Sequence, residues 1–315
     1  MYIFGSKSII VIMRQAPFLK KGDTIAITCP SGFIAKETIL KAKENLENWG
    51  YHVVIGNTVG ESDNYFSAPD DVKVADLQAF LDDEHISAII MGRGGYGMSR
   101  IIDQLDFSKF ILNPKWICGF SDITVIHSHL QSNFGIASIH SPMCGSFTKE
   151  LMKKDFMKCF KNMLRGQALQ YPIHPNPNNV AGHAKGILIG GNLAMLAHLS
   201  GSVSAPNAHG KILFIEDIGE HLYNIDRMLY NLKRSGVFDR LIGVICGGFT
   251  DLQDTTRPFG QDIYQILSAH FNHLGIPVVY DFPSGHIEEN YPIMLGGIYE
   301  MNVGTEEVIV RYQPA

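Results

Sequence analysis

The first half of the chain alternates short apolar runs with longer amphipathic segments, and this alternation restricts the possible folds more than any other feature. The apolar runs have the length of buried strands, and the segments between them have helical spacing. Strands that alternate with helices at this interval form a parallel, doubly wound α/β sheet. We therefore expect strands at 23–30, 51–57, 85–92, 116–120 and 137–140, and helices at 35–50, 70–84, 98–105, after Ser121, and at 149–166.

The pattern changes after residues 167–182, which are rich in proline and asparagine and typical of a linker. The strand-like runs that follow are short and often flanked by glycine, and two helix-like segments interrupt them. They lie at 185–201, 211–219, 241–250, 277–283 and 306–312, with the helices at 222–236 and 261–275. The sequence thus predicts an N-terminal doubly wound parallel-sheet domain at 13–166 and a smaller C-terminal mixed α/β domain, rich in short strands, at 183–315.

Charge and cysteine usage exclude several classes of protein. The formal net charge is −5 and no basic patch stands out, which argues against a nucleic-acid partner. The five cysteines are an odd number and form no CxxC pair. They predict a reducing compartment, and neither a disulfide framework nor a zinc cluster.

The N-terminal residues contain an apolar run at 8–13 that is too short to span a membrane. No small-residue cleavage site follows this run, and the regular pattern begins only near Pro17. We therefore expect residues 1–12 to be an extension, with no membrane association and no export. The expected location is the cytoplasm.

A serine and an aspartate stand where a buried strand gives way to a helix. Ser121 and Asp122 follow the apolar run at 116–120. Such residues commonly cap a helix, because their side chains accept hydrogen bonds from the first helical turn. A serine at a strand-to-helix turn is also the position of a nucleophile in some hydrolases. Both interpretations stay open at this point.

A glycine-rich stretch at 92–97 follows the third expected strand and matches the pattern GxGxxG. A dinucleotide site is one interpretation, although that fingerprint normally opens the first strand–helix unit. A tight turn is another. A third is an oxyanion site, because glycines leave backbone N–H groups accessible to a bound substrate.

Glu216 and Asp217 end an apolar strand, and His286 follows the turn after another strand. Acids at strand ends often simply meet solvent, and a loop histidine is often incidental. A carboxylate can also orient a histidine that acts as a base. The histidines lack a metal-binding spacing: His127 and His129 point to different helix faces, and no HExxH motif occurs.

Several blocks together resemble the LD-carboxypeptidase family, serine peptidases that include muramoyltetrapeptide carboxypeptidases and microcin C self-immunity peptidases. The resemblance runs in order from about Pro17 to near the C-terminus. It is carried by GRGGYGMSRIIDQLDF, ICGFSDIT, GGNLAMLAHLSG, ILFIEDIGEHLYNIDRML, GGFTD and DFPSGH.

The resemblance implies a catalytic triad of Ser121, Glu216 and His286, with the backbone N–H groups of Gly95 and Asp122 as oxyanion donors. It implies a murein tetrapeptide substrate that loses its terminal D-alanine in the cytoplasm, during cell-wall recycling. It also implies a homodimer without a metal or organic cofactor. Two alternatives remain: a microcin-immunity-type peptidase that cleaves aminoacyl-nucleotide conjugates, and, more distantly, a dinucleotide-binding protein that uses residues 92–97.

Overall fold

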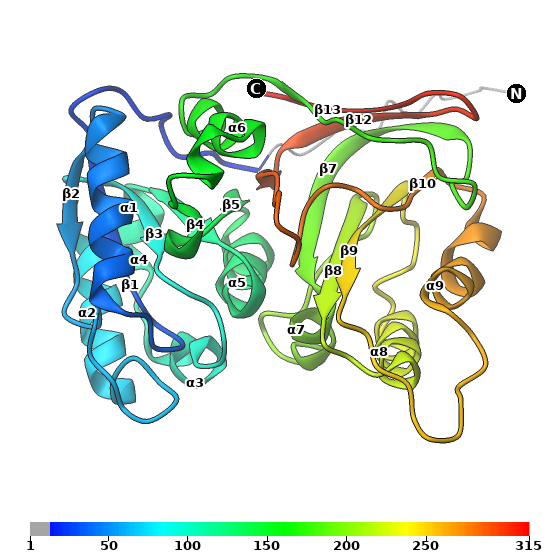
Figure 1. The fold of residues 1–315 in the computed structure, drawn as a ribbon, viewed down its shortest axis with the longest axis horizontal. Coiled ribbons are helices and arrows are strands. Elements are labelled where there is room, and N and C mark those ends of the chain that lie inside the picture. Colours follow the sequence, from blue (N-terminus) through cyan, green and yellow to red (C-terminus); the bar gives the residue numbers. More distant parts are fainter. Residues whose placement is uncertain (1–12, 315) are drawn as a thin grey trace, which may run out of the picture.

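The structure, a computed structural model, describes residues 13–314 and contains two sheets flanked by helices (Figure 1). The expected extension at 1–12 lies outside the described residues. The helices are α1 (Lys36–Asn48), α2 (Asp70–Asp82), α3 (Met98–Ile101), α4 (Ser108–Leu112), α5 (Thr124–Phe134), α6 (Asp155–Leu164), α7 (Leu193–His198), α8 (Leu222–Arg234) and α9 (Ile263–Phe271). Between residues 13 and 314, no helix has the length and apolar character needed to cross a bilayer.

The first sheet contains six strands in the order β11-β5-β4-β3-β1-β2. Their bounds are β1 (Thr24–Thr28), β2 (His52–Ile55), β3 (Ile86–Met91), β4 (Trp116–Gly119), β5 (Ser138–His140) and β11 (Ile293–Leu295). Strands β1 to β5 are parallel, and β11 joins β5 antiparallel. We call this sheet and helices α1–α6 the first lobe.

Successive side chains of a strand point to opposite faces, so each strand of this sheet contributes to two cores. Ile25 and Ile27 pack on the side of α1 and α6, whereas Ala26 packs on the side of α2 and α5. The parallel sheet with helices on both faces confirms the fold class predicted for this half.

The second sheet contains seven strands in the order β10-β9-β8-β7-β12-β13-β6. Their bounds are β6 (Leu169–Gln170), β7 (Gly182–Asn192), β8 (Ile212–Ile218), β9 (Gly243–Thr250), β10 (Val278–Val279), β12 (Ile298–Val303) and β13 (Val308–Gln313). Strands β7 to β10 are parallel, and β12, β13 and β6 are antiparallel. Together with α7–α9 they form the second lobe, which confirms the predicted mixed α/β class.

The prediction of a strand along 185–201 was wrong in its second half. Strand β7 ends at Asn192, and α7 begins at the next residue. Gly190 and Gly191 have φ of +130° and +142°, and the Asn192 side chain caps α7 by accepting a hydrogen bond from the Met195 N–H. Strands β11 and β12 were also not expected from the sequence.

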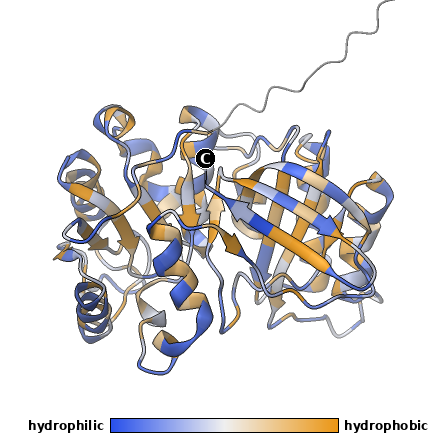
Figure 2. Cartoon of the chain, turned by 90° about the horizontal axis from the view of Figure 1, so that it is seen from above, coloured by the Kyte–Doolittle hydropathy of each residue, from blue (hydrophilic) through white to orange (hydrophobic). Residues whose placement is uncertain are grey.

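The two lobes share one apolar core. It contains Ile27 and Trp116 of the first sheet together with Phe214, Tyr299 and Val310 of the second. Figure 2 shows apolar residues concentrated in the strands of both sheets, whereas the helices carry both hydrophilic and hydrophobic residues. Helix α5 lies between the lobes and contacts both β5 and β7, which explains why residues 124–131 are buried on every side (Figure 1).

The segment expected to be a linker runs along the second lobe. Leu169 and Gln170 form the edge strand β6, paired with β13. The Tyr171 hydroxyl is buried and donates a hydrogen bond to the Pro292 carbonyl at 2.8 Å. This packing fixes the path of the chain between the lobes.

Candidate active site

The glycine stretch and Ser121 follow neighbouring parallel strands, so their side chains and amides meet at the carboxyl edge of the first sheet. Gly92 comes directly after β3, and Ser121 comes two residues after β4. A Cβ atom at Gly94 would lie 2.9 Å from the Ser121 Cβ, so this turn can rest against the serine only as glycine. Ser121 has a φ of +64°, a left-handed conformation that is costly for a residue other than glycine.

Asp122 does not cap the helix that follows it, and this corrects the capping interpretation of this stretch. Its carboxylate is buried and accepts hydrogen bonds from the Ser31 hydroxyl at 2.6 Å and from the Met98 N–H at 2.8 Å. Burial raises the pKa of the Asp122 carboxyl, against the lowering effect of these two bonds. The side chain therefore ties the segment after Ser121 to the end of the glycine stretch.

The residues that follow Gly94 and Ser121 are Gly95 and Asp122, whose backbone N–H groups are the expected oxyanion donors. Within residues 13–314, neither N–H donates a hydrogen bond to another protein atom. Gly95 is exposed and has a φ of +105°. Free N–H groups beside a serine hydroxyl are the donors that an oxyanion requires.

The dinucleotide interpretation of residues 92–97 finds no support in this geometry. The helix after the stretch, α3, has four residues, so it offers no long helix dipole for a pyrophosphate. The glycines instead permit close packing: a Cβ at Gly92 would lie 2.4 Å from the Cys29 Sγ, and one at Gly97 would lie 2.8 Å from the Pro30 carbonyl oxygen.

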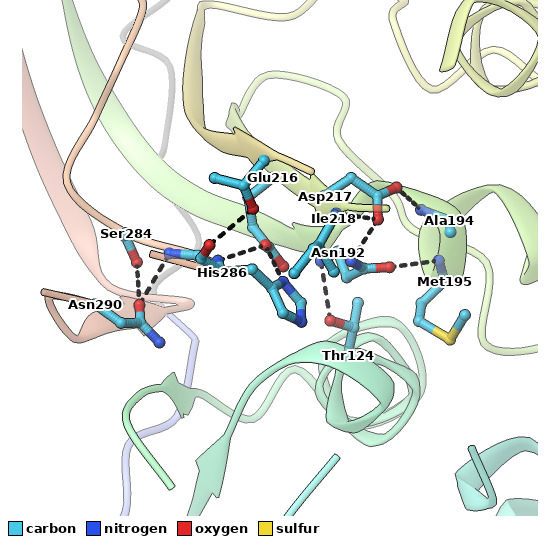
Figure 3. A network of polar contacts seen from close by, with 12 residues as sticks. Thr124, Asn192, Ala194, Met195, Glu216, Asp217, Ile218, Ser284, His286 and Asn290 are labelled. Atoms are coloured by element: carbon cyan, nitrogen blue, oxygen red, sulfur yellow. Dashed lines mark hydrogen bonds and ion pairs between the residues drawn. The ribbon is translucent and has the colours of Figure 1, made fainter. Parts of the chain in front are cut away.

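The structure brings Glu216 and His286 into direct contact. The Glu216 carboxylate is fully buried in β8, and its Oε2 accepts hydrogen bonds from the His286 Nδ1 at 2.6 Å and the His286 backbone N–H at 3.1 Å (Figure 3). Because Nδ1 donates to the carboxylate, the imidazole leaves Nε2 free to accept a proton.

Burial alone would lower the pKa of His286, but the hydrogen bond and charge of Glu216, with a further contribution from Asp217, raise it above its usual value. The loop that carries the histidine is held by Asn290, whose Oδ1 accepts from the Gly285 N–H at 2.9 Å (Figure 3). A Cβ at Gly285 would lie 2.7 Å from the Glu216 Cβ, so glycine is needed for the close approach.

Ser121 and His286 line one cavity of about 470 Å³ between the lobes. The Phe120 ring packs on the imidazole with its centroid 4.8 Å away. Among the described residues, no hydrogen bond joins the Ser121 hydroxyl to His286; catalytic hydrogen bonds of this kind often tighten only when substrate binds. The other lining residues are Ile34, Gly92, Arg93, Gly94, Gly95, Met143, Gly145 and Ser146.

The site residues predicted from the sequence therefore converge, although they come from both lobes. Sequence reasoning did not find roles for Asn192 and Thr124, which lie behind the Glu216–His286 pair (Figure 3). Asp217 could be singled out from the sequence, because it directly follows Glu216 at the end of the same strand. In the described part of the chain, no group of three or more His, Cys, Asp or Glu side chains has the geometry of a metal site.

Comparisons with known proteins cover both lobes. Residues 25–141 match the LD-carboxypeptidase N-terminal domain family, and residues 185–301 match the LD-carboxypeptidase C-terminal domain family. A probable murein peptide carboxypeptidase of Bacillus subtilis is 28% identical over 97% of this chain and 97% of its own length. The microcin C7 self-immunity protein of Escherichia coli is 26% identical over 88% of this chain and 90% of its own length. The crystal structure of muramoyltetrapeptide carboxypeptidase from Oxalobacter formigenes has a TM-score of 0.82 and 28% identity, and covers 93% of this chain and 100% of that one.

Proposed function

Because the chain belongs to the LD-carboxypeptidase family, we propose that it is a serine-type enzyme that releases the terminal D-alanine from murein tetrapeptides. We place this activity in the cytoplasm, in the recycling of cell-wall peptides, and we propose that the protein acts as a homodimer. The family resemblance supports the location and the assembly. The activity has support from the arrangement of the site.

One observation carries the proposal: Ser121 lines the same cavity as His286, whose Nδ1 is held by a buried carboxylate. In the proposed reaction, the His286 Nε2 takes the proton of the Ser121 hydroxyl as the oxygen attacks the carbonyl before D-alanine. The Gly95 and Asp122 N–H groups stabilise the oxyanion.

The attack gives a tetrahedral intermediate that carries the oxyanion. Its collapse breaks the peptide bond, and the D-alanine amine leaves with the proton from His286. Water then hydrolyses the acyl-serine, again with His286 as the base. Glu216 keeps the imidazole in the required tautomer and stabilises its cationic form. One water is consumed, and the products are a tripeptide and D-alanine.

A carboxypeptidase must distinguish the end of a chain from its middle, and the cavity offers the means. Arg93 is a cationic side chain that lines it, and no Asp or Glu of the described residues does so. We propose that Arg93 and the Gly94 N–H hold the terminal carboxylate of the substrate, while the Gly95 N–H faces the oxyanion. Such a site rejects a neutral terminus, because its polar groups then lack their charged partner.

A panel of four substrates tests this proposal with purified protein. We expect D-alanine release from L-Ala-D-Glu-diamino acid-D-Ala, and little cleavage of its C-terminal amide or of the analogue that ends in L-alanine. Comparable cleavage of these three would show that the site does not recognise a D-configured chain end.

The fourth substrate, an aminoacyl-sulfamoyl adenosine, tests the alternative activity. The 26% identity to the microcin C7 self-immunity protein favours keeping this activity as the second candidate. Rapid cleavage of this compound, with no D-alanine released from the tetrapeptide, would support the immunity-type peptidase in place of the murein enzyme.

A further inference from the structure

The ends of β7 and β8 carry a polar network that does not line the cavity (Figure 3). The two strands are parallel, and their register places Asn192 beside Glu216. Because consecutive side chains leave a strand on opposite faces, Glu216 reaches His286, whereas Asp217 points toward the start of α7.

Asp217 is 2% exposed and is held by three N–H donors. Its Oδ1 accepts from the Asn192 Nδ2 and the Ile218 N–H, both at 2.9 Å, and its Oδ2 accepts from the Ala194 N–H at 3.0 Å. These bonds connect the end of β8 to the last residue of β7 and to the first turn of α7.

The network continues into the first lobe. The Asn192 backbone N–H donates to the Thr124 hydroxyl at 3.0 Å. A Cβ at Gly191 would lie 2.6 Å from the same oxygen, so glycine lets the end of β7 lie directly on this threonine. Thr124 is the first residue of α5 and follows Ser121 after a single short turn.

We propose that Thr124, Asn192 and Asp217 form a latch between the lobes. The latch fixes the position of the segment 121–124, which carries the proposed nucleophile, relative to the His286–Glu216 pair. The inference rests on the proposed function, since it assigns positioning residues for that reaction. Other hydrogen bonds between the lobes lie further along α5, such as that from the Ser132 hydroxyl to the Ala205 carbonyl at 2.8 Å.

Asp217 has a second effect on the site through its charge. The titratable groups whose charges act on His286 are Glu216 and Asp217 of β8, which raise its pKa, and the buried His140 of β5 interacts with it as well. Burial and the neighbouring Glu216 raise the pKa of Asp217 itself to about 7. Where Asp217 is ionised, its charge stabilises the imidazolium, so we expect removal of this carboxylate to lower the pKa of His286.

Two isosteric variants test the latch. Thr124→Val keeps the shape of the side chain but removes the acceptor, and Asp217→Asn removes the negative charge. We expect kcat for D-alanine release to fall roughly 10- to 100-fold in both, as for a small displacement of a reacting group. KM should stay near the wild-type value, because these residues do not line the cavity. The acid limb of kcat/KM should move to lower pH in Asp217→Asn and stay in place in Thr124→Val.

Three controls make the result specific. Thr124→Ser restores the hydroxyl acceptor and should recover the wild-type kcat. Ser132→Ala removes a contact between the lobes far from Ser121 and should leave kcat unchanged. A melting temperature for each variant separates loss of activity from loss of folding. Wild-type kcat and an unshifted pH profile in both Thr124→Val and Asp217→Asn would overturn the latch.

Labelling with a small fluorophosphonate separates this failure from failure of the proposed function. The probe bonds phosphorus to a nucleophilic serine oxygen and releases fluoride, so it needs no knowledge of the substrate. We expect the latch variants to be labelled more slowly than the wild type, and Ser121→Ala not to be labelled. Equal labelling of wild type and Ser121→Ala would refute the nucleophile itself, whereas equal labelling of wild type and the latch variants would refute only the latch.

Discussion

At the scale of single residues, the site depends on backbone positions that few side chains can occupy. Ser121 has a left-handed backbone, and Gly94 lies against it at a distance that excludes a Cβ. Gly285 meets the same requirement beside Glu216. The sequence indicated turns at these glycines but not the close contacts that require them.

The approach of Gly94 to Ser121 gives the first residue-scale prediction. Gly94→Ala would place a methyl group 2.9 Å from the Ser121 Cβ, and we expect kcat/KM to fall about 100-fold because the proposed nucleophile must shift. Gly145→Ala is a matched control in the same cavity, since a Cβ there meets no protein atom within 4 Å. Steady-state kinetics of both variants check the prediction, which fails if the two lose activity equally.

The second residue-scale prediction concerns pH. His286 must be neutral to act as a base, and its pKa is raised, so kcat/KM of the wild type should rise with pH through a value above the ordinary pKa of a histidine side chain. Glu216→Gln removes the charge that stabilises the imidazolium, so the acid limb should move to lower pH. The maximal rate should also fall, by about 10⁴-fold if the loss matches that of the equivalent change in a known serine protease. A pH–rate profile with an unmoved acid limb would contradict this role of Glu216.

At the scale of elements, helix α9 begins at a cap whose residues do not line the cavity. Asp262 caps α9: its side chain accepts from the Gln265 N–H, and the Gln265 side chain accepts from the Asp262 N–H. We expect Asp262→Ala to lower the free energy of unfolding by about 1 kcal/mol and to leave kcat/KM unchanged. Denaturant unfolding and steady-state kinetics measure the two quantities, and a large loss of activity at equal stability would show that α9 affects the site.

The alternation of apolar runs and amphipathic segments was enough to predict most elements of the first lobe, because β1, β3, β4 and β5 are buried strands that alternate along the chain with the helices that cover them. The second lobe was harder to predict. The boundary between β7 and α7 depends on two glycines with positive φ and on the cap by Asn192, and neither is visible in hydrophobic periodicity. Strand β11 is three residues long and pairs with β5, which belongs to the other half of the sequence.

At the scale of the whole molecule, two lobes with a common core bring together residues that are distant in sequence. Ser121 belongs to the first lobe, whereas Glu216 and His286 belong to the second. The residue types and strand-end positions indicated a site, and the family resemblance implied which residues share it. The contacts between the lobes, such as Asn192 with Thr124, could not be predicted, because they depend on how two separately patterned sheets pack.

If Ser121 is the nucleophile of a D-alanine-releasing peptidase, its replacement by alanine should abolish D-alanine release and leave the fold intact. The measurement is the rate of D-alanine release from L-Ala-D-Glu-diamino acid-D-Ala by the wild type and by Ser121→Ala, each in the presence of EDTA. We expect the wild type to be fully active with the chelator and the variant to lose activity on the order of 10⁶-fold, with an unchanged melting temperature. A variant that keeps more than a few per cent of the wild-type rate, or a wild type that EDTA inactivates and zinc restores, would show that Ser121 is not the nucleophile.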